Sequence, residues 1–191
     1  MKMEKGQPGY IKARKLRYLV WAVAEFGIVA AIIILGYVQT GNRLNLFTVV
    51  GIVGCLPAAK MLVEFITMAP HKSIAPERYQ EIQNKASLLT RVYDLIITSN
   101  EKVMPVEAMV ISGHVVCGYS ESPKTDETEL ARHLKSLLKA NRMDKITVKI
   151  FHDYDAFLAR AEGMNNMASV DGTGTGKRER SIKNIILSTA M

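Results

Sequence analysis

Two long apolar runs near the N-terminus limit what this chain can fold into. The first run is Leu16–Val38 and the second is Leu44–Met68. A helix needs about 20 apolar residues to cross the hydrocarbon core of a bilayer, and both runs are long enough. The polar turn Gln39–Arg43 joins them, so the sequence predicts an antiparallel pair of membrane helices. A cleaved secretory signal is the alternative for the first run, but no small-residue cleavage site follows it.

Basic residues are concentrated around the first apolar run. Residues 1–69 carry eight Lys or Arg against three Asp or Glu, whereas residues 70–191 carry seventeen against fifteen. The positive-inside rule therefore predicts that both termini lie in the cytoplasm. Because the rest of the chain is nearly balanced in charge, we do not expect nucleic-acid binding. The basic residues at the membrane flank are Lys12, Arg14, Lys15 and Arg17, and the turn between the spans holds only Arg43.

Two opposite charges lie inside the predicted spans at matching depth. Glu25 follows Arg17 by eight residues, and Lys60 precedes Met68 by eight residues. At 1.5 Å per residue, each charge lies about 12 Å from the cytoplasmic boundary. A lone charge at such depth costs on the order of 2–3 kcal/mol. The sequence therefore predicts a Glu25–Lys60 pair across the hairpin, with Glu64 as the local competitor one turn from Lys60.

The remaining residues predict one small cytoplasmic domain. The fold class that we expect is a membrane α-helical hairpin plus a cytoplasmic α/β (α+β) domain with the order αβββαβα. The predicted boundaries are 1–15 for a basic cytoplasmic N-terminus, 16–68 for the hairpin, 69–162 for the domain and 163–191 for a flexible Gly-rich basic tail. The predicted elements are a helix at Ser73–Val92, strands at Tyr93–Thr98, Val103–Ser112 and His114–Tyr119, a helix at Asp126–Ala140, a strand at Ile146–Phe151 and a helix at Asp153–Glu162. A weak amphipathic helix is expected at Ser181–Ala190.

Two carboxylates are the candidates for catalysis. Asp94 lies on the first predicted strand and Glu107 on the second, so they could share a metal ion if these strands pair. The alternative is that Asp94 caps a backbone group or lies at the surface, and that Glu107 faces solvent. The stretch Pro105–Tyr119, PVEAMVISGHVVCGY, resembles the central hairpin of the nuclease-related domain, a restriction-endonuclease-like family. That resemblance implies a metal-binding acid at Glu107, but the family's Glu-x-Lys is missing from the next strand.

A second resemblance covers the whole chain. The stretches GCLPAAKMLVEFI, YDLIITSNEKVMPVEAMVISG and VKIF resemble uncharacterised two-span membrane proteins of Gram-positive bacteria. This resemblance implies a location in the bacterial cytoplasmic membrane and brings no biochemical function with it.

Other motifs give no sign of a cofactor or a metal ion. The histidines His71, His114, His133 and His152 lack metal-ligand spacing. Cys117 has no activating neighbour in sequence, so we expect a small buried residue there. The stretch Asp171–Lys177, DGTGTGK, lacks the glycine spacing and the final hydroxyl residue of a phosphate-binding loop. We therefore predict no cofactor and no metal.

Three functional classes remain open on the sequence alone. The first is a non-enzymatic membrane-anchored domain that binds a protein partner or a second copy of itself. The second is a membrane-tethered metal-dependent nuclease or hydrolase using Asp94 and Glu107. The third is an auxiliary subunit of a larger membrane complex. The lipid bilayer is an expected partner in each case, and the sequence indicates no small-molecule substrate.

Overall fold

The computed structural model describes residues 4–42, 45–99, 102–170 and 176–190. The chain forms two compact units. One unit is Ile11–Lys72, and the other combines Met1–Tyr10 with Ser73–Met191. Each unit has its own packing, and each is described below by itself.

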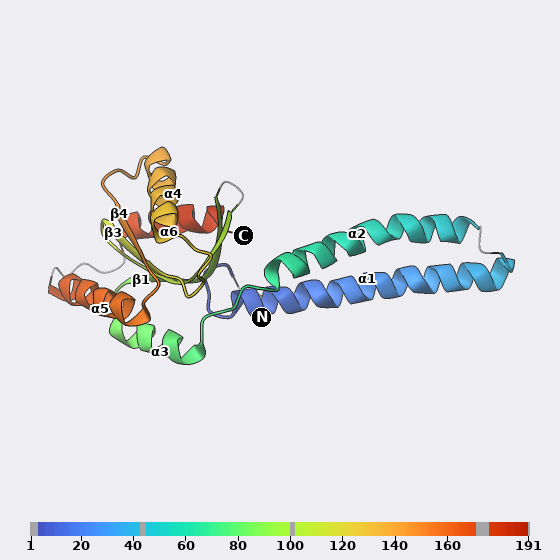
Figure 1. Ribbon diagram of the computed structural model, residues 1–191, viewed down its shortest axis with the longest axis horizontal. Coiled ribbons are helices and arrows are strands. Elements are labelled where there is room, and N and C mark those ends of the chain that lie inside the picture. Colours follow the sequence, from blue (N-terminus) through green and yellow to red (C-terminus); the bar gives the residue numbers. More distant parts are fainter. Residues whose placement is uncertain (1–3, 43–44, 100–101, 171–175, 191) are drawn as a thin grey trace. The chain divides into compact units, whose positions relative to one another are not determined.

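The first unit is a pair of antiparallel helices, α1 (Tyr10–Thr40) and α2 (Leu46–Met68), which run side by side (Figure 1). Both helices are long and apolar enough to span a membrane, as the sequence predicted. Only 17% of the most apolar window of α1 and 11% of that of α2 are buried, whereas a core helix of a soluble protein hides most of its surface. Helix α1 begins before the predicted span, at Tyr10, and so includes the basic flank.

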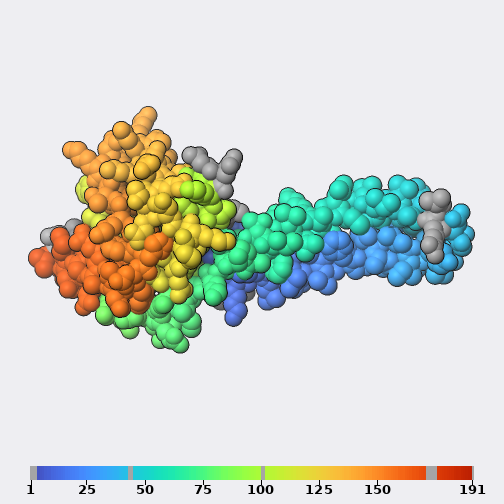
Figure 2. All heavy atoms as spheres, viewed as in Figure 1, coloured from blue at the N-terminus to red at the C-terminus, as the bar shows by residue number. Residues whose placement is uncertain are grey.

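Small residues bring the two helices of the hairpin together. A methyl group at Gly51 would lie 2.6 Å from Cγ1 of Ile33, and one at Gly36 would overlap Cβ of Phe47. Side chains larger than hydrogen are therefore excluded at both positions. The side chain of Asn45 caps α2 by accepting a hydrogen bond from the backbone N–H of Thr48 at 2.9 Å. The atoms of the two helices are in contact along the hairpin (Figure 2).

The second unit is built on a four-stranded mixed sheet with the order β1-β2-β3-β4. Strands β1 to β3 form an antiparallel meander, and β4 pairs in parallel with β3. This small mixed sheet with its helices agrees with the predicted fold class. The elements are α3 (Pro76–Lys85), β1 (Thr90–Ser99), β2 (Lys102–Ser112), β3 (Val115–Tyr119), α4 (Glu127–Ala140), β4 (Thr147–Phe151), α5 (Tyr154–Val170) and α6 (Lys177–Thr189).

Helices cover both faces of the sheet (Figure 1). Helices α4 and α6 pack on one face, where Leu134 and Ile186 are fully buried. Helices α3 and α5 pack on the other face, where Ile82 and Phe157 are fully buried. The unit is therefore a three-layer sandwich, and each layer of helices contributes its own hydrophobic core.

The first helix of this unit is shorter than predicted. We expected a helix over Ser73–Val92, but α3 ends at Lys85 and β1 begins at Thr90. The apolar positions repeat with helical spacing through Leu89, so periodicity alone placed the boundary too late. The β-branched Thr90 and Val92 favour the strand, and both are buried in it.

The tail predicted at 163–191 is not a flexible linker in the described residues. Helix α5 continues through Gly163 to Val170, because Met164 and Ala168 extend its buried face. Helix α6 overlaps the weak amphipathic helix expected at Ser181–Ala190 and begins four residues earlier, at Lys177. It returns to the sheet and buries Ile182 and Ile186 in the core with α4. Residues 171–175 of the Gly-rich motif lie outside the described part of the chain.

The N-terminal segment, predicted as a basic arm over 1–15, is divided between the two units. The carbonyl oxygen of Gly6 accepts a hydrogen bond from the backbone N–H of Tyr93 at 3.0 Å. The side chain of Lys5 donates to the carbonyl oxygen of Ala190 at 3.0 Å. Gly6 has a φ of +85°, and a Cβ there would lie 2.9 Å from Val92, so glycine permits the close approach of this segment to β1.

Candidate functional site

Asp94 and Glu107 face each other where the pairing of β1 and β2 is interrupted. The register joins Tyr93 to Ala108 and Leu95 to Val106, but it omits the pair between them. Asp94 has a φ of +53°, which is unusual for a residue other than glycine. Side chains along each strand alternate between the cores on the two faces of the sheet. At this point that alternation shifts by one residue on both strands. The two carboxylates therefore share a local irregularity, as in paired β-bulges.

Both carboxylates bind backbone groups of this unit. Oδ1 of Asp94 accepts a hydrogen bond from the N–H of Ile74 at 2.9 Å. Oε2 of Glu107 accepts one from the N–H of Glu121 at 3.0 Å. Asp94 is 1% exposed and Glu107 is 8% exposed, so solvent reaches neither side chain freely. Asp94 thus caps a backbone group, which was one of the alternatives from sequence, whereas Glu107 is buried rather than solvent-facing.

The environment of Glu107 favours its protonated form. Burial is the main cause that raises the pKa of this carboxyl above its usual value of 4.5, and the negative charges of Glu121 and Asp94 raise it further. Backbone hydrogen bonds act in the opposite direction. Among the described residues, no group of three or more His, Cys, Asp or Glu side chains is arranged to hold a metal ion. The facing strand Val115–Tyr119 supplies no lysine beside the pair.

Among the described residues of the hairpin, no ion pair joins Glu25 to Lys60, and the predicted pair stays a prediction. Neither residue has an ion pair within the part of the chain that the structure describes, and Oε2 of Glu25 is buried without a hydrogen-bond partner there. The position of Lys60 around the axis of α2 explains why the two side chains do not meet. The buried residues Gly51 and Ala58 mark the face of α2 that contacts α1, and Lys60 lies two residues, about 200°, beyond Ala58. Lys60 therefore points away from α1 and is exposed.

The basic flank residues all lie in the first turns of α1, and Lys15 and Arg14 contact groups inside the hairpin. The ammonium group of Lys15 donates to the carbonyl oxygens of Ala69, at 2.7 Å, and His71. It thus neutralises the negative C-terminal end of α2. Arg14 donates from Nε to the hydroxyl of Tyr18 at 2.9 Å. Lys12 and Arg17 are exposed.

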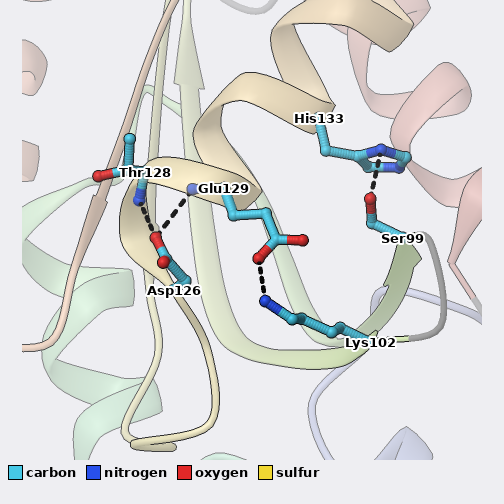
Figure 3. Close-up of polar contacts among 6 residues, drawn as sticks. All are labelled: Ser99, Lys102, Asp126, Thr128, Glu129 and His133. Carbon is cyan, nitrogen blue, oxygen red and sulfur yellow. Dashed lines mark hydrogen bonds and ion pairs between the residues drawn. The ribbon is translucent and has the colours of Figure 1, made fainter.

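A serine–histidine contact joins the end of β1 to α4 (Figure 3). Oγ of Ser99 lies 3.0 Å from Nδ1 of His133, a distance that also suits a nucleophile and its general base. Ser99 is only 5% exposed, so a substrate could not reach its hydroxyl. Nε2 of His133 is buried and has no hydrogen-bond partner among the described residues, so no acid orients the ring. This contact was not predicted, because no sequence motif links the two residues.

The start of α4 is fixed by the charged residues around it (Figure 3). Oδ1 of Asp126 accepts hydrogen bonds from the N–H groups of Thr128, at 2.8 Å, and Glu129, at 2.9 Å. The bond from Glu129 is the main cause that lowers the pKa of the Asp126 carboxyl. The carboxylate of Glu129 also pairs with the ammonium of Lys102 at 2.6 Å. These contacts are typical of a helix N-terminus and need no catalytic role.

A cleft of about 540 Å³ lies on the other side of the unit, between the β2–β3 turn, α5 and the start of α6. We call it the Arg–Met cleft. Its charged and polar lining includes Arg160, Arg178 and His114, and its apolar lining includes Met164 and Met167. Its volume is in the range of natural ligand sites. The remaining lining residues are Ser112, Gly113, Val115, Ala168, Gly176 and Glu179.

A buried carboxylate holds the walls of the Arg–Met cleft together. Glu179, on the first turn of α6, is 7% exposed. Its Oε1 accepts a hydrogen bond from the N–H of Gly113 at 2.8 Å, and its Oε2 accepts one from the hydroxyl of Thr90 at 2.9 Å. Arg178 is fixed to the neighbouring loop by donating to the carbonyl oxygen of Asp144 at 3.1 Å. The cleft is therefore preformed by contacts among residues far apart in the chain.

Cys117 lies beneath the methionine wall of the cleft. It is fully buried, and its Sγ is 3.5 Å from Sδ of Met164. Burial raises the pKa of the thiol, which opposes formation of the nucleophilic thiolate. Cys117 is thus placed as a small core residue, as the sequence suggested.

Comparison of the chain with known proteins finds no matching family model, no matching curated protein and no matching solved structure.

Proposed function

We propose that this chain is a two-pass protein of the bacterial cytoplasmic membrane, with both termini in the cytoplasm, and that its α/β unit is a non-enzymatic binding domain for a protein partner. The exposed apolar surfaces of α1 and α2 support the membrane location. The surplus of basic residues on the flank of α1 supports the orientation.

One contrast supports binding over catalysis. The two carboxylates that a hydrolase would need are buried and accept hydrogen bonds from the backbone N–H groups of Ile74 and Glu121. The Arg–Met cleft, by contrast, is open and combines cationic with apolar side chains. Such a surface suits recognition, because methionine side chains adapt to different apolar partners.

Reporter fusions test the orientation. A reporter after Met191 should give a cytoplasmic signal, and one inserted in the turn Gln39–Arg43 should give an external signal. The reverse pattern would refute the proposed topology.

Site-specific photo-crosslinking tests the binding role. A photoreactive residue in place of Met167, which is 64% exposed beside the cleft, should capture a partner in intact membranes. The same residue in place of Lys135, exposed on α4 across the sheet, is the matched control. We expect adducts at position 167 and not at position 135. Equal labelling at both positions, or at neither, would contradict a binding role for this face.

The nuclease alternative has its own test. Purified full-length protein should leave DNA and RNA intact in the presence of Mg²⁺ or Mn²⁺. Cleavage that is lost in Glu107→Ala would overturn the non-enzymatic proposal.

A further inference from the structure

We infer that the Arg–Met cleft binds an acidic segment of a partner protein that also carries large apolar side chains. This inference rests on the proposed binding function and names the chemistry of the partner. Four features of the cleft support the inference: its charged residues, its apolar wall, the exposed apolar surface next to it and the hydrogen bonds that fix its walls.

The charges of the cleft select an acidic ligand. Arg160 from α5 and Arg178 from α6 lie on two different walls, and His114 lies at the β2–β3 turn. The carboxylate of Glu179 is turned into the fold, toward Gly113 and Thr90. Two arginines from separate elements therefore line one cleft, and the guanidinium of Arg178 is held beside it by its hydrogen bond to the carbonyl oxygen of Asp144. Guanidinium groups bind carboxylates with paired hydrogen bonds.

The apolar wall of the cleft favours a ligand that carries apolar side chains as well as negative charge. Met164, Met167 and Ala168 lie within about one turn of each other on α5. Met164 and Ala168 are buried in the core, so Met167, which is 64% exposed, is the side chain that this wall presents to a ligand. Thioether side chains are flexible and polarizable, so they pack against leucine, isoleucine or aromatic side chains of different shapes. A small hydrophilic anion would leave the exposed side chain of Met167 uncovered.

The exposed surface continues beyond the cleft. Val170 follows Met167 by three residues on α5, and it is 86% exposed. Side chains three residues apart lie on the same face of a helix, so Val170 prolongs the apolar wall past the end of the cleft. Exposed apolar side chains both in the cleft and beyond it favour a peptide segment, which can cover Met167 and Val170 together.

The walls of the cleft are fixed before a ligand arrives. Glu179 ties α6 to the β2–β3 turn and to β1 through two hydrogen bonds. Met164 lies on the fully buried Cys117. A preformed site loses less conformational entropy on binding, which raises affinity.

Fluorescence anisotropy with the full chain in detergent micelles tests the inference. The probe is a labelled twelve-residue peptide in which glutamate and leucine alternate. Two control peptides replace every glutamate by lysine or every leucine by serine. We expect the glutamate–leucine peptide to bind at least tenfold more tightly than either control, and its affinity to fall with added salt.

Two substitutions locate the binding. Arg160→Glu should weaken binding of the glutamate–leucine peptide at least tenfold, whereas Arg132→Glu on the exposed surface of α4 is the matched control and should leave it unchanged. Met167→Ser should weaken binding without a change in net charge. Both cleft positions are exposed, so each variant is expected to fold, and protease resistance of the α/β unit checks this.

Several outcomes would overturn the inference. Equal binding of the glutamate–serine peptide would show electrostatic attraction alone, and equal loss in Arg160→Glu and Arg132→Glu would show binding elsewhere. If Met167 is crosslinked in membranes while the glutamate–leucine peptide shows no preference, the binding function stands and the chemistry proposed for the partner is wrong. If crosslinking fails as well, both proposals fail.

Discussion

Replacing Ile186 by alanine tests whether α6 is part of the core of the α/β unit. Ile186 is fully buried among side chains of the sheet and α4. A buried isoleucine-to-alanine change costs about 2–5 kcal/mol, from lost transfer energy and the cavity that remains. With a cost of about 3 kcal/mol and a urea dependence of about 2 kcal/mol per molar, the unfolding midpoint should fall by about 1.5 M. Asn184→Ala, on the exposed face of the same helix, should leave the midpoint nearly unchanged.

Pulse proteolysis of the full chain in urea and a mild detergent measures this midpoint. Equal midpoints for Ile186→Ala and Asn184→Ala would refute the placement of α6 in the core. A chain ending at Glu162 extends the test, because it loses Met164, Ile182 and Ile186, each buried. At about 1.5–3 kcal/mol per buried side chain, the loss is about 5–9 kcal/mol. The whole stability of a domain of this size is about 5–15 kcal/mol, so residues 69–162 should not fold stably by themselves.

Three further predictions concern the carboxylates and the hairpin. Glu107→Gln should stabilise the α/β unit at pH 7, and the gain in urea midpoint should vanish below about pH 4.5, because the raised pKa makes ionisation of Glu107 costly only at higher pH. Asp94→Ala should cost about 2–4 kcal/mol in the same assay, whereas Asp94→Asn, which keeps an acceptor and tolerates positive φ, should cost less than half of that. Gly36→Ala should reduce accumulation of the protein in membranes through overlap with Phe47, whereas Gly27→Ala, with no atom within 4 Å of the new methyl group, should not; equal accumulation of the two variants would contradict the packing of the hairpin.

The elements that sequence predicts well are those determined by local pattern. The two apolar runs indicate α1 and α2 because no other structure satisfies so long an apolar backbone in a bilayer. The meander β1 to β3 follows from short β-branched runs separated by turns, and its register is observed along both pairs. In each case, the residues that determine the element lie within it.

The elements that sequence predicts poorly depend on distant contacts. The Gly-rich stretch after Glu162 has the composition of a linker, but Met164 and Ile186 are buried by opposite faces of the sheet. The spacing of Ile182 and Ile186 by four residues was the signal for a packed helix. The Arg–Met cleft could not be predicted, because it joins Gly113, Arg160 and Arg178 only after α5 and α6 have packed.

Aspartate is a residue type suited to catalysis, but the carboxylate of Asp94 binds the backbone of another chain segment and attaches that segment to β1. The segment before α1 and the segment after α2 each form a hydrogen bond with β1, and the two residues of β1 involved are adjacent. Gly6 accepts a hydrogen bond from the N–H of Tyr93, and Ile74 donates its N–H to the carboxylate of Asp94. The positive φ of Asp94 marks the break in the ladder where its side chain receives this bond. The hydrogen bond from Ile74 thus gives Oδ1 of Asp94 a structural role, which is to fasten the segment that follows the hairpin to β1.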